Sequence, residues 1–452
     1  MKELKLKEAI KNMIDFIAPT SVEYRNFVIN SKEVKKGDVF VGIKGVKNDG
    51  NNFYKEAYRN GASLVIFDNP YFYKEAPFNK VLVKDSVEAI KSIGKWKLER
   101  SVAKKIAITG SMGKTSTKNM LYKIFSNQYQ THMSYKNYNN ELGIAISCAN
   151  MEDEIDYAIF EFGTNTKGEI KTYAEYVRPE VAVVTKIGFS HIGNFKSKEN
   201  IAREKFSIIS PNTVKELWIH EDDEVFLDKK ALGTVKLFTY GVKENSDVVL
   251  KSVSKIGNIY QFELEFKGRR YCFELRHFFK HFIMNAVLAA GIALNEEIEY
   301  EYIFEGIRSF KPAEKRGEIV KFDDYIIIDD TYNASFESII AAIDSLDEYE
   351  VKSEKYAIIG EMAEIGEFED KFYSELVDYA KKKSGINFLF CGEYFSSFIS
   401  EKNLKFFKNK ALLYRYLEKI PEGVFLVKAS RSRKFEEVVD YLKQRGSKKN
   451  VI

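Results

Sequence analysis

The chain has 452 residues, a length that suggests two to four domains of ordinary size. Hydrophobic residues make up 45% of it, which is enough for each domain to bury a core. The 70 Lys and Arg residues nearly balance the 66 Asp and Glu residues, and the formal net charge is +4. This interspersed, balanced charge gives no reason to expect nucleic acid or a membrane surface as a partner.

The three cysteines, Cys148, Cys272 and Cys391, lie far apart and form no CxxC pair. Their spacing favours reduced, buried thiols over a disulfide framework or a zinc site. The amino-terminal segment lacks the apolar core of a signal peptide, and no run of about 18 apolar residues occurs. We therefore expect a soluble, cytoplasmic protein without a membrane span.

The first region, residues 1–101, contains short apolar runs of strand length. These runs are residues 38–43, 62–67 and 80–83. A helical stretch from residue 86 to residue 101 follows them. We predict a small α/β domain here.

The second region, residues 102–312, alternates buried-strand and helical patterns. Its buried-strand candidates are residues 105–109, 157–161 and 181–185. This alternation is typical of a parallel sheet with helices on both faces. A β-rich stretch over residues 248–275 and a helix rich in small residues, 285–294, complete the region.

The third region, residues 313–452, repeats the alternation. Its buried-strand candidates are residues 325–329, 356–360, 387–391 and 424–428. They predict a second doubly wound, Rossmann-like α/β domain. The fold class predicted for the whole chain is therefore α/β, in three domains.

A phosphate-binding loop joins the strand that ends at Thr109 to a helix predicted to begin near Thr115. The loop reads Gly110-Ser111-Met112-Gly113-Lys114-Thr115-Ser116. Such a loop needs glycines at its turns, free N–H groups at a helix start, a Lys for the β and γ phosphates and a hydroxyl for magnesium. The match is to the shorter TGxxGKT[ST] form, and by itself it predicts only a nucleoside triphosphate.

Oxygen ligands for magnesium are expected beside this loop. Thr115 offers a hydroxyl, and Glu161 ends a buried strand, at the edge of a parallel sheet where ligands bind. His191 follows another strand and could ligate a second ion through a neutral imidazole. A surface carboxylate and a structural histidine are the simpler alternatives. Lys205 lies in an amphipathic helix, where composition assigns it no role.

With these motifs the chain resembles the Mur ligases, the ATP-dependent amide ligases of peptidoglycan synthesis, over nearly its whole length. Residues 30–50 are similar to the family's uridine-nucleotide-binding segment, which implies that Ser31 contacts a UDP group. Residues 109–116 have the family's form of the phosphate loop. Residues 137–143 match its GNxNNExG segment, with Asn139 and Asn140 on the substrate side.

The segment 161–170 is the most specific, because it resembles the E-x-G-x-N-x-x-G-E-I of the subgroup that adds D-alanyl-D-alanine, and it implies that Asn165 contacts substrate. His191 and the segment 201–205 match the family's metal-binding His and the Lys that is carbamylated in several relatives. A carbamate would turn the Lys205 cation into an anion that can hold a second magnesium ion.

Further matches lie towards the carboxyl terminus. His281 matches the adenine-side stretch HNxxNAxAA, and residues 330–334, 360–366 and 428–431 resemble the subgroup's D-[ST]-Y-N-A, GDMxELG and KGSR. The nucleotide contacts implied are Asn285, Arg316 and Asp330, and the substrate contacts implied are Tyr332, Asn333 and Lys428. Contacts from the third domain imply hinge closure near Pro312.

The resemblance implies that ATP drives amide formation between D-alanyl-D-alanine and UDP-N-acetylmuramoyl tripeptide through an acyl phosphate, with release of ADP and phosphate. Lys114 would bind the β and γ phosphates. Two Mg²⁺ ions are implied: Thr115 and Glu161 would hold one, and His191 with a carbamate on Lys205 the other. A monomer is also implied.

Several positions depart from the family pattern. They are Lys32, Lys136, Thr166-Lys167, Phe282, Ser335-Phe336 and Ala429. Some lie where substrate would bind, so the acceptor and the amine stay open. A ligase that adds D-alanyl-D-lactate or D-alanyl-D-serine, or that acts on pseudopeptidoglycan, would look similar.

Two other readings remain. Folylpolyglutamate synthase shares the fold, the loop and the chemistry, but folate enzymes begin almost directly with the loop, whereas about 100 residues precede it here. A non-catalytic nucleotide-binding protein predicts degenerate catalytic positions, whereas all five expected residues are present, namely Lys114, Thr115, Glu161, His191 and Lys205.

Overall fold

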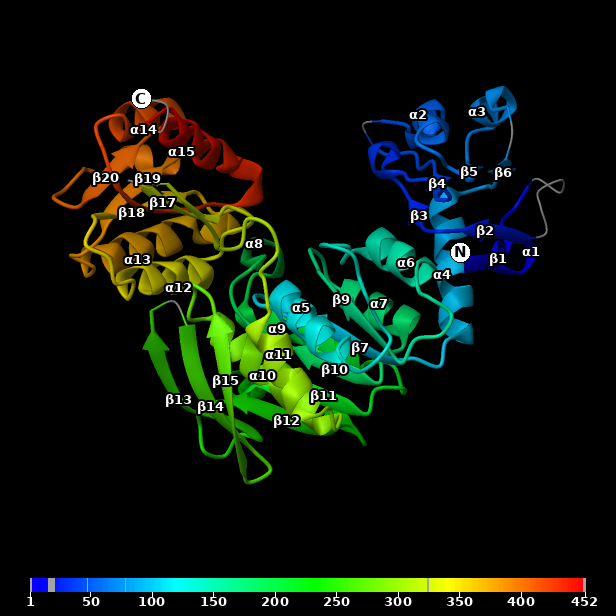
Figure 1. The fold of residues 1–452 in the computed structure, drawn as a ribbon, viewed down its shortest axis with the longest axis horizontal. Coiled ribbons are helices and arrows are strands. Elements are labelled where there is room, and N and C mark those ends of the chain that lie inside the picture. Colours follow the sequence, from blue (N-terminus) through cyan, green and yellow to red (C-terminus); the bar gives the residue numbers. More distant parts are fainter. Residues whose placement is uncertain are drawn as a thin grey trace.

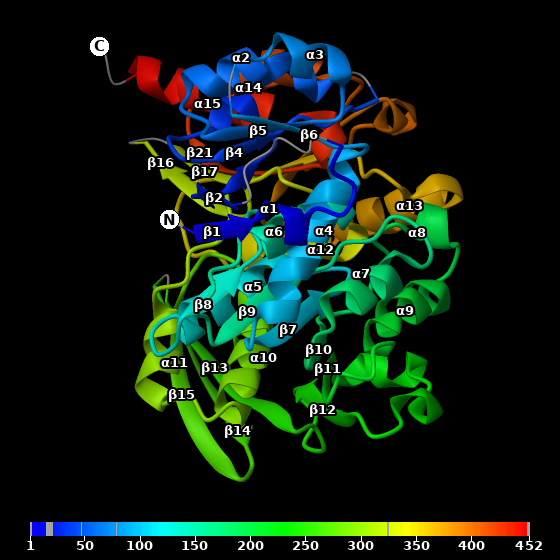
Figure 2. The same ribbon diagram turned by 90° about the vertical axis from the view of Figure 1, so that its right-hand side faces the viewer.

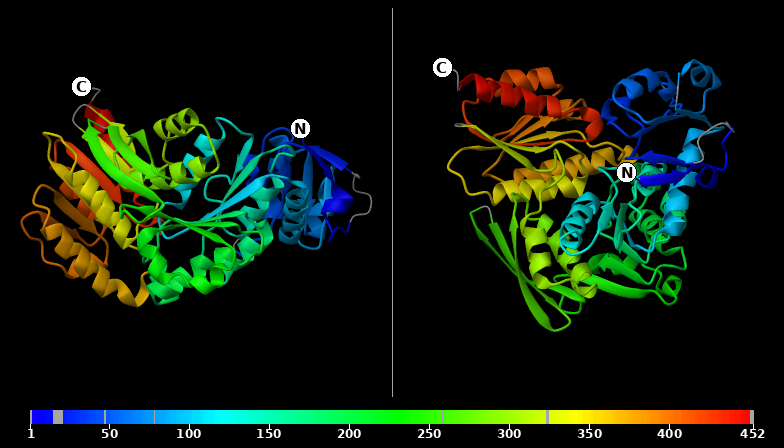
Figure 3. Two further views of the ribbon diagram at one scale, coloured as in Figure 1. Left: turned by 90° about the horizontal axis from the view of Figure 1, so that it is seen from below. Right: turned by 45° about the vertical axis from the view of Figure 1, so that its right-hand side comes forward.

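The computed structural model describes residues 2–14, 21–46, 48–77, 79–257, 259–322 and 325–449. Sheets of four, nine and six strands follow one another along these residues, together with a two-stranded ribbon near the amino terminus (Figure 1). The blue amino-terminal region and the red carboxyl-terminal region flank the central one (Figure 3). The arrangement confirms the predicted α/β fold in three regions.

The amino-terminal sheet is parallel and carries apolar side chains on both faces. Its strands, in sheet order, are β3 (Phe27–Val28), β4 (Val39–Val41), β5 (Leu64–Phe67) and β6 (Lys80–Leu82). Helices α2 (Tyr54–Arg59) and α3 (Pro70–Glu75) cover one face, and α4 (Ser86–Arg100) covers the other. The ribbon of β1 (Lys2–Lys5) and β2 (Ser21–Tyr24), with the short α1 (Leu6–Ala9), lies against α4. The predicted strands and helix are confirmed.

The central sheet is parallel over most of its width. Its parallel strands are β7 (Lys104–Thr109), β8 (Thr131–Met133), β9 (Tyr157–Glu161), β10 (Val181–Val184), β11 (Glu216–His220) and β12 (Lys236–Gly241). An antiparallel extension follows, made of β13 (Val248–Ile256), β14 (Ile259–Phe266) and β15 (Arg269–Arg276). The sheet order is β15-β14-β13-β12-β11-β10-β7-β9-β8.

Helices lie on both faces of this sheet, as predicted (Figure 2). Helices α5 (Lys114–Phe125), α10 (Phe282–Asn295) and α11 (Tyr300–Arg308) pack together on one face. The other side carries α6 (Glu141–Ala149), α7 (Glu169–Val177), α8 (Ile192–Phe195) and α9 (Lys198–Phe206). Helix α6 also packs against α4, which joins the amino-terminal and central regions.

The strand order brings the phosphate loop and Glu161 together. Strand β7 pairs with β9 on one side and β10 on the other, and Ile108 stands opposite Glu161. Since parallel strands end at the same edge, the loop after Thr109 and the carboxylate of Glu161 meet there. The expectation drawn from the sequence is confirmed.

The carboxyl-terminal sheet is also doubly wound. Its strands are β16 (Glu318–Lys321), β17 (Tyr325–Asp330), β18 (Lys355–Gly360), β19 (Asn387–Cys391), β20 (Leu404–Phe407) and β21 (Gly423–Lys428), in the order β16-β17-β21-β18-β19-β20. Helices α12 (Phe336–Asp347) and α13 (Glu369–Lys381) face the central region, while α14 (Lys410–Leu417) and α15 (Glu436–Lys449) lie on the opposite face (Figure 1).

The carboxyl-terminal region is docked on the central one. Their apolar side chains form a continuous core. At its border the Phe189 N–H donates to Glu337 at 2.7 Å, and Lys280 pairs with Glu348 at 2.9 Å. A hinge motion near Pro312 that closes the carboxyl-terminal region onto the central one stays a prediction.

Cys148 and Cys391 are buried as expected, but Cys272 is exposed, so the prediction was wrong there. Its strand, β15, is the edge strand of the central sheet, and one of its faces meets solvent. Among the described residues, no helix has both the length and the apolar character that crossing a membrane requires.

Candidate active site

A cavity of about 500 Å³ lies where the carboxyl ends of the central and carboxyl-terminal parallel strands face each other. The predicted site residues that line it are Ser111, Met112, Gly113, Lys114, Thr115, Ser116, Asn139, Asn140, Glu161, Asn165, His191, Lys205, Asn285, Arg316, Asp330, Tyr332, Asn333 and Lys428. Gly110, the residue before Ser111, does not itself line the cavity. Ser31 does not line the cavity.

The phosphate loop ends in a helix start with no side-chain cap. Gly113, at φ 82°, precedes α5, and among the described residues no side-chain cap is seen at the start of that helix. A Cβ on Gly113 would lie 2.5 Å from Oδ1 of Asn285, so a side chain does not fit there. An uncapped helix start beside a glycine turn is a site for an anion such as a phosphate.

Lys114 folds back over the loop, and its Nζ donates to the Gly110 carbonyl at 2.7 Å. Burial lowers the pKa of Lys114, against the opposing effect of the Glu161 carboxylate. An anionic ligand in the cavity would supply the counter-charge that this buried ammonium needs.

Glu161 is 1% exposed, and two side chains contact its carboxylate. Its Oε1 accepts from Nδ2 of Asn139 at 2.9 Å, and its Oε2 lies 3.4 Å from Nζ of Lys118. Burial acts to raise the pKa of Glu161, but the Lys118, Lys114 and Arg316 cations outweigh it and keep the pKa below its ordinary value. The carboxylate is therefore ionised at neutral pH, and its Oε2 accepts no hydrogen bond.

Lys118 is a site residue that the sequence reasoning missed. It is 1% exposed, and its Nζ donates to the carbonyls of Ser134, at 3.0 Å, and Lys136. It thus links α5 to Glu161 and to the backbone that leads into the Asn137–Asn140 segment. The signal was available, because Lys118 follows Lys114 by four residues and so lies on the same helix face.

His191, in the loop just before α8, and Lys205, on α9, both line the cavity. His191 has a left-handed backbone, with φ 63°, and its Nδ1 lies 2.5 Å from Oε2 of Glu364 in the carboxyl-terminal region. Lys205 is 2% exposed, and none of the described side chains pairs with its Nζ. Burial, assisted by the charge of Lys114, lowers the pKa of Lys205 well below its ordinary value.

Glu204, beside Lys205, was also missed. Its carboxylate accepts from the N–H groups of Gly168, at 2.6 Å, and Ile170, at 2.9 Å, at the start of α7. Negative charge is stabilising at a helix amino terminus. Glu204 therefore fixes α9, and with it Lys205, against the loop that contains Asn165.

Two predicted substrate residues have structural contacts of their own. Asn139 donates to Glu161, as described above. Asn140 caps α6, where its Oδ1 accepts from the Gly143 N–H at 2.9 Å. An Asn before a helix is a common cap, so this second contact could have been read from the sequence.

The carboxyl-terminal wall of the cavity is built on neighbouring strands. Asp330 on β17 stands opposite Lys428 on β21, and Nζ of Lys428 donates to its Oδ2 at 2.6 Å and to the Asn333 carbonyl at 3.0 Å. The guanidinium of Arg316 lies 3.9 Å from the centre of the Tyr332 ring, a cation–π contact. Lys428 thus holds the wall that carries Asp330 and Asn333.

On the adenine side of the predicted site, burial lowers the pKa of His281 to about 3, so its imidazole is neutral. Phe282, which departs from the family pattern, is 3% exposed and packs edge-on against His277 with 4.4 Å between ring centres. The aromatic ring therefore contributes to the core beside the cavity wall.

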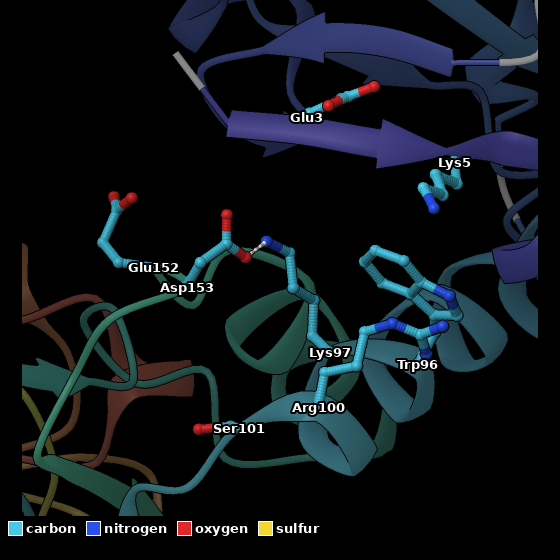
Figure 4. A pocket seen from close by; sticks show the side chains of 8 residues that line it. All are labelled: Glu3, Lys5, Trp96, Lys97, Arg100, Ser101, Glu152 and Asp153. Carbon is cyan, nitrogen blue, oxygen red and sulfur yellow. Dashed lines mark hydrogen bonds and ion pairs between the residues drawn. The ribbon is translucent and has the colours of Figure 1, made fainter.

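Ser31 lies in the amino-terminal region, in the 3-10 helix η1 (Ser31–Glu33), where its hydroxyl bonds to Glu56. A second cavity, of about 300 Å³, lies where this region meets the central one (Figure 4). There Lys97 pairs with Asp153, and the guanidinium of Arg100 lies 4.2 Å from the centre of the Trp96 ring. No predicted site residue lines this second cavity.

Within the described ranges, no group of three His, Cys, Asp or Glu side chains is arranged to hold a metal. Magnesium often takes only one or two protein ligands and completes its shell with water and phosphate oxygens. Thr115 and Glu161, which line the same cavity, offer two oxygen donors of that kind.

Comparison with known proteins supports this picture. The Mur ligase middle domain matches residues 108–293, and the catalytic domain of the Mur ligase family matches residues 23–95. The chain is 30% identical to the UDP-N-acetylmuramoyl-tripeptide–D-alanyl-D-alanine ligase of Bacillus subtilis, over 96% of this chain and 98% of that protein.

Solved structures agree over the same length. MurF from Acinetobacter baumannii superposes with a TM-score of 0.84 at 26% identity, covering 97% of this chain and 98% of that one. MurF ligase from Thermotoga maritima in complex with ADP has a TM-score of 0.76 at 27% identity, covering 94% and 98%. Because the likeness extends through all three regions, the chain belongs to the Mur ligase family.

Proposed function

We propose that this protein is an ATP-dependent ligase that joins D-alanyl-D-alanine to UDP-N-acetylmuramoyl tripeptide and releases ADP and phosphate. The observation that carries the proposal is the single cavity that unites the phosphate loop with Arg316, Asp330 and Lys428 from the other sheet. The full-length relatives with this activity support the choice of substrates.

The cavity fits a nucleoside triphosphate. The uncapped start of α5 and the space left by Gly113 offer backbone N–H groups to the phosphates, and Lys114 supplies a buried cation. Asn285, whose side chain borders Gly113, would lie on the adenine side with Arg316 and Asp330 opposite.

The donor set also fits magnesium. Oε2 of Glu161 is buried, ionised and without a hydrogen bond, and the Thr115 hydroxyl lines the same cavity. Magnesium, when bound, would neutralise charge on the phosphates during transfer. Asn139 and Lys118 hold the carboxylate in place.

The proposed reaction has two steps. The terminal carboxylate of the tripeptide attacks the γ-phosphorus of ATP, and the bond to the β-phosphate oxygen breaks to give an acyl phosphate and ADP. The amine of D-alanyl-D-alanine then attacks the acyl carbon, loses a proton and expels phosphate. Lys114 and Arg316 contribute by positioning and by positive charge.

We further propose that Lys205 carries a carbamate, which with His191 would hold a second ion. Carbamylation requires a neutral amine, and burial lowers the pKa of Lys205 well below its ordinary value. The amine also lacks a carboxylate partner among the described residues. A carbamate would convert a buried, unpaired cation into an anion that a metal can bind.

Carbon-13 NMR in labelled bicarbonate tests the carbamate directly. The protein should show one carbamate signal that Lys205→Ala abolishes and that Lys171→Ala, on the exposed face of α7, retains. Turnover lost in Lys205→Ala should be partly restored by a short carboxylic acid. If the wild-type protein showed no carbamate signal and Lys205→Ala turned over normally, Lys205 would not have this role.

The identity of the amine is tested by product mass. With ATP and UDP-N-acetylmuramoyl tripeptide, D-alanyl-D-alanine should give the pentapeptide product, while D-alanyl-D-lactate and D-alanyl-D-serine should give much less. Preference for either of these would redirect the proposal to a different amine. The match of residues 23–95 to a Mur ligase domain supports this class over a folate ligase, which lacks such a region before the loop.

We also propose a cytoplasmic location, because ATP is the phosphoryl donor. The expected monomer stays a prediction that light scattering would test.

A further inference from the structure

Two loops from different sheets meet behind the wall of the cavity. One precedes α8 in the central region and carries His191, and the other follows β18 and carries Glu364. Nδ1 of His191 lies 2.5 Å from Oε2 of Glu364. His191 lines the cavity, whereas Glu364 is not among its lining residues and contacts the imidazole from the carboxyl-terminal region.

The backbone of both loops is shaped for this contact. His191 and Glu364 both have left-handed φ angles, 63° and 64°, which are uncommon for residues with a side chain. The Gly193 N–H donates to the Glu364 carbonyl at 2.9 Å. A Cβ on Gly193 would lie 2.8 Å from that carbonyl oxygen, so the approach requires glycine.

A second interaction between regions lies beside the first. Lys196, at the end of α8, pairs with Glu367 of the 3-10 helix η6 (Gly366–Phe368) at 3.1 Å. Both side chains are exposed, about 60% and 65%. A pair so exposed to solvent contributes little to docking, and it does not touch His191.

The chemistry of imidazole gives the contact between His191 and the half-exposed Glu364 its meaning. A neutral imidazole carries a proton on one ring nitrogen and a lone pair on the other. The hydrogen-bond partner of one nitrogen determines which nitrogen carries the proton. An ionised carboxylate only accepts hydrogen bonds. At 2.5 Å from the carboxylate oxygen, Nδ1 is the nitrogen that we expect to carry the proton, which leaves the lone pair on Nε2. Metal-binding histidines are commonly oriented by a carboxylate in this way.

We propose that Glu364 is a positioning residue that fixes His191 in the Nδ1–H tautomer and so makes Nε2 available to a divalent cation. Because Glu364 belongs to the carboxyl-terminal region, the arrangement exists only while that region is docked. Docking and metal binding are therefore coupled through this one side-chain contact. The metal part of this inference rests on the proposed function, and the tautomer does not.

Nitrogen-15 NMR of the imidazoles tests the tautomer. The chain has only five histidines, so selective labelling gives few signals, and His191→Gln identifies the one required. In the wild-type protein with ADP, His191 should show a protonated Nδ1 and an unprotonated Nε2. Glu364→Gln should keep this pattern, since an amide oxygen also accepts, and Glu364→Ala should lose it. A proton on Nε2 in the wild type would overturn the proposal.

Metal affinity tests the coupling, with Mn²⁺ as the probe and electron paramagnetic resonance as the readout. Removing the carboxylate behind a metal-binding histidine typically weakens binding by about 10- to 100-fold. We expect this loss for Glu364→Ala and for Gly193→Ala, which separates the loops but keeps both side chains. Glu367→Ala, the matched control, should bind normally. Unchanged affinity in both test variants, or equal loss in all three, would refute the coupling.

These measurements separate two kinds of failure. If the protein does not turn over the proposed substrates, the imidazole signals still report whether Glu364 sets the tautomer. If turnover is normal and the tautomer is wrong, the proposed function stands and the positioning role falls.

Discussion

Replacing Lys118 with Met would remove a buried cation and keep most of the side-chain volume. The carbonyls of Ser134 and Lys136 lose their donor, and the Glu161 carboxylate loses the cation that lies 3.4 Å from it. Both side chains of the ion pair are almost fully buried, at 1% and 2% exposure. The charge left on Glu161 therefore has little solvent to stabilise it.

The expected cost follows from this burial. Removing one partner of a buried ion pair costs about 3–5 kcal/mol, chiefly because the other charge is left uncompensated. Lys114 and Arg316 also act on Glu161, so we expect the lower end of that range. For a region of roughly 200 residues, each kcal/mol lowers the unfolding temperature by about 2–4 °C. The central region of Lys118→Met should therefore unfold roughly 6–12 °C earlier.

Scanning calorimetry with two further variants measures this. Lys118→Met combined with Glu161→Gln should recover part of the lost stability, because the unpaired charge is gone. Lys123→Met, on the exposed side of α5, should unfold like the wild-type protein. A shift within 2 °C for Lys118→Met, of the size that surface changes produce, would refute the reasoning. So would a double variant less stable than the single one.

Two further predictions concern the loop and a buried acid. Gly113→Ala should weaken the binding of an ATP analogue at least about tenfold, as measured by calorimetry, because strain at φ 82° adds to the collision with Asn285. The control Gly168→Ala, at φ 94° in open space, should bind the analogue normally. Equal affinities of the two variants would contradict this prediction. Burial raises the pKa of Asp223 to about 6, so the folded state holds the proton more tightly and stability falls as pH rises towards 6. Asp223→Asn should therefore raise the unfolding temperature more at pH 8 than at pH 5, and an equal or reversed effect would contradict the shift.

The strands and the phosphate loop could be predicted because their signals are local. A strand buried on both faces of a parallel sheet is a continuous apolar run, and 157–161 and 424–428 are of that kind. Glu161 was placed correctly because it ends such a strand beside another whose end carries the loop. The edge strand β15 is not buried on both faces, and for this reason the prediction that Cys272 is buried was wrong.

The contacts that hold the site could not be predicted, because they join residues far apart in the chain. Glu364 meets His191 only through the docking of two sheets, and Glu204 meets the start of α7 only through helix packing. The pairing of Lys428 with Asp330 depends on the position of β21 beside β17, which sheet order alone determines. The helix spacing of Lys114 and Lys118 was the exception, since that signal lies within one helix.

Release of phosphate from ATP and Mg²⁺ is the measurement that tests the central claim most directly. The protein is supplied with UDP-N-acetylmuramoyl tripeptide and D-alanyl-D-alanine, together and singly. The account predicts sustained release only when both are present, with a product of pentapeptide mass. No release with the pair, from protein that still binds ATP, would contradict the assigned substrates and leave only the nucleotide site.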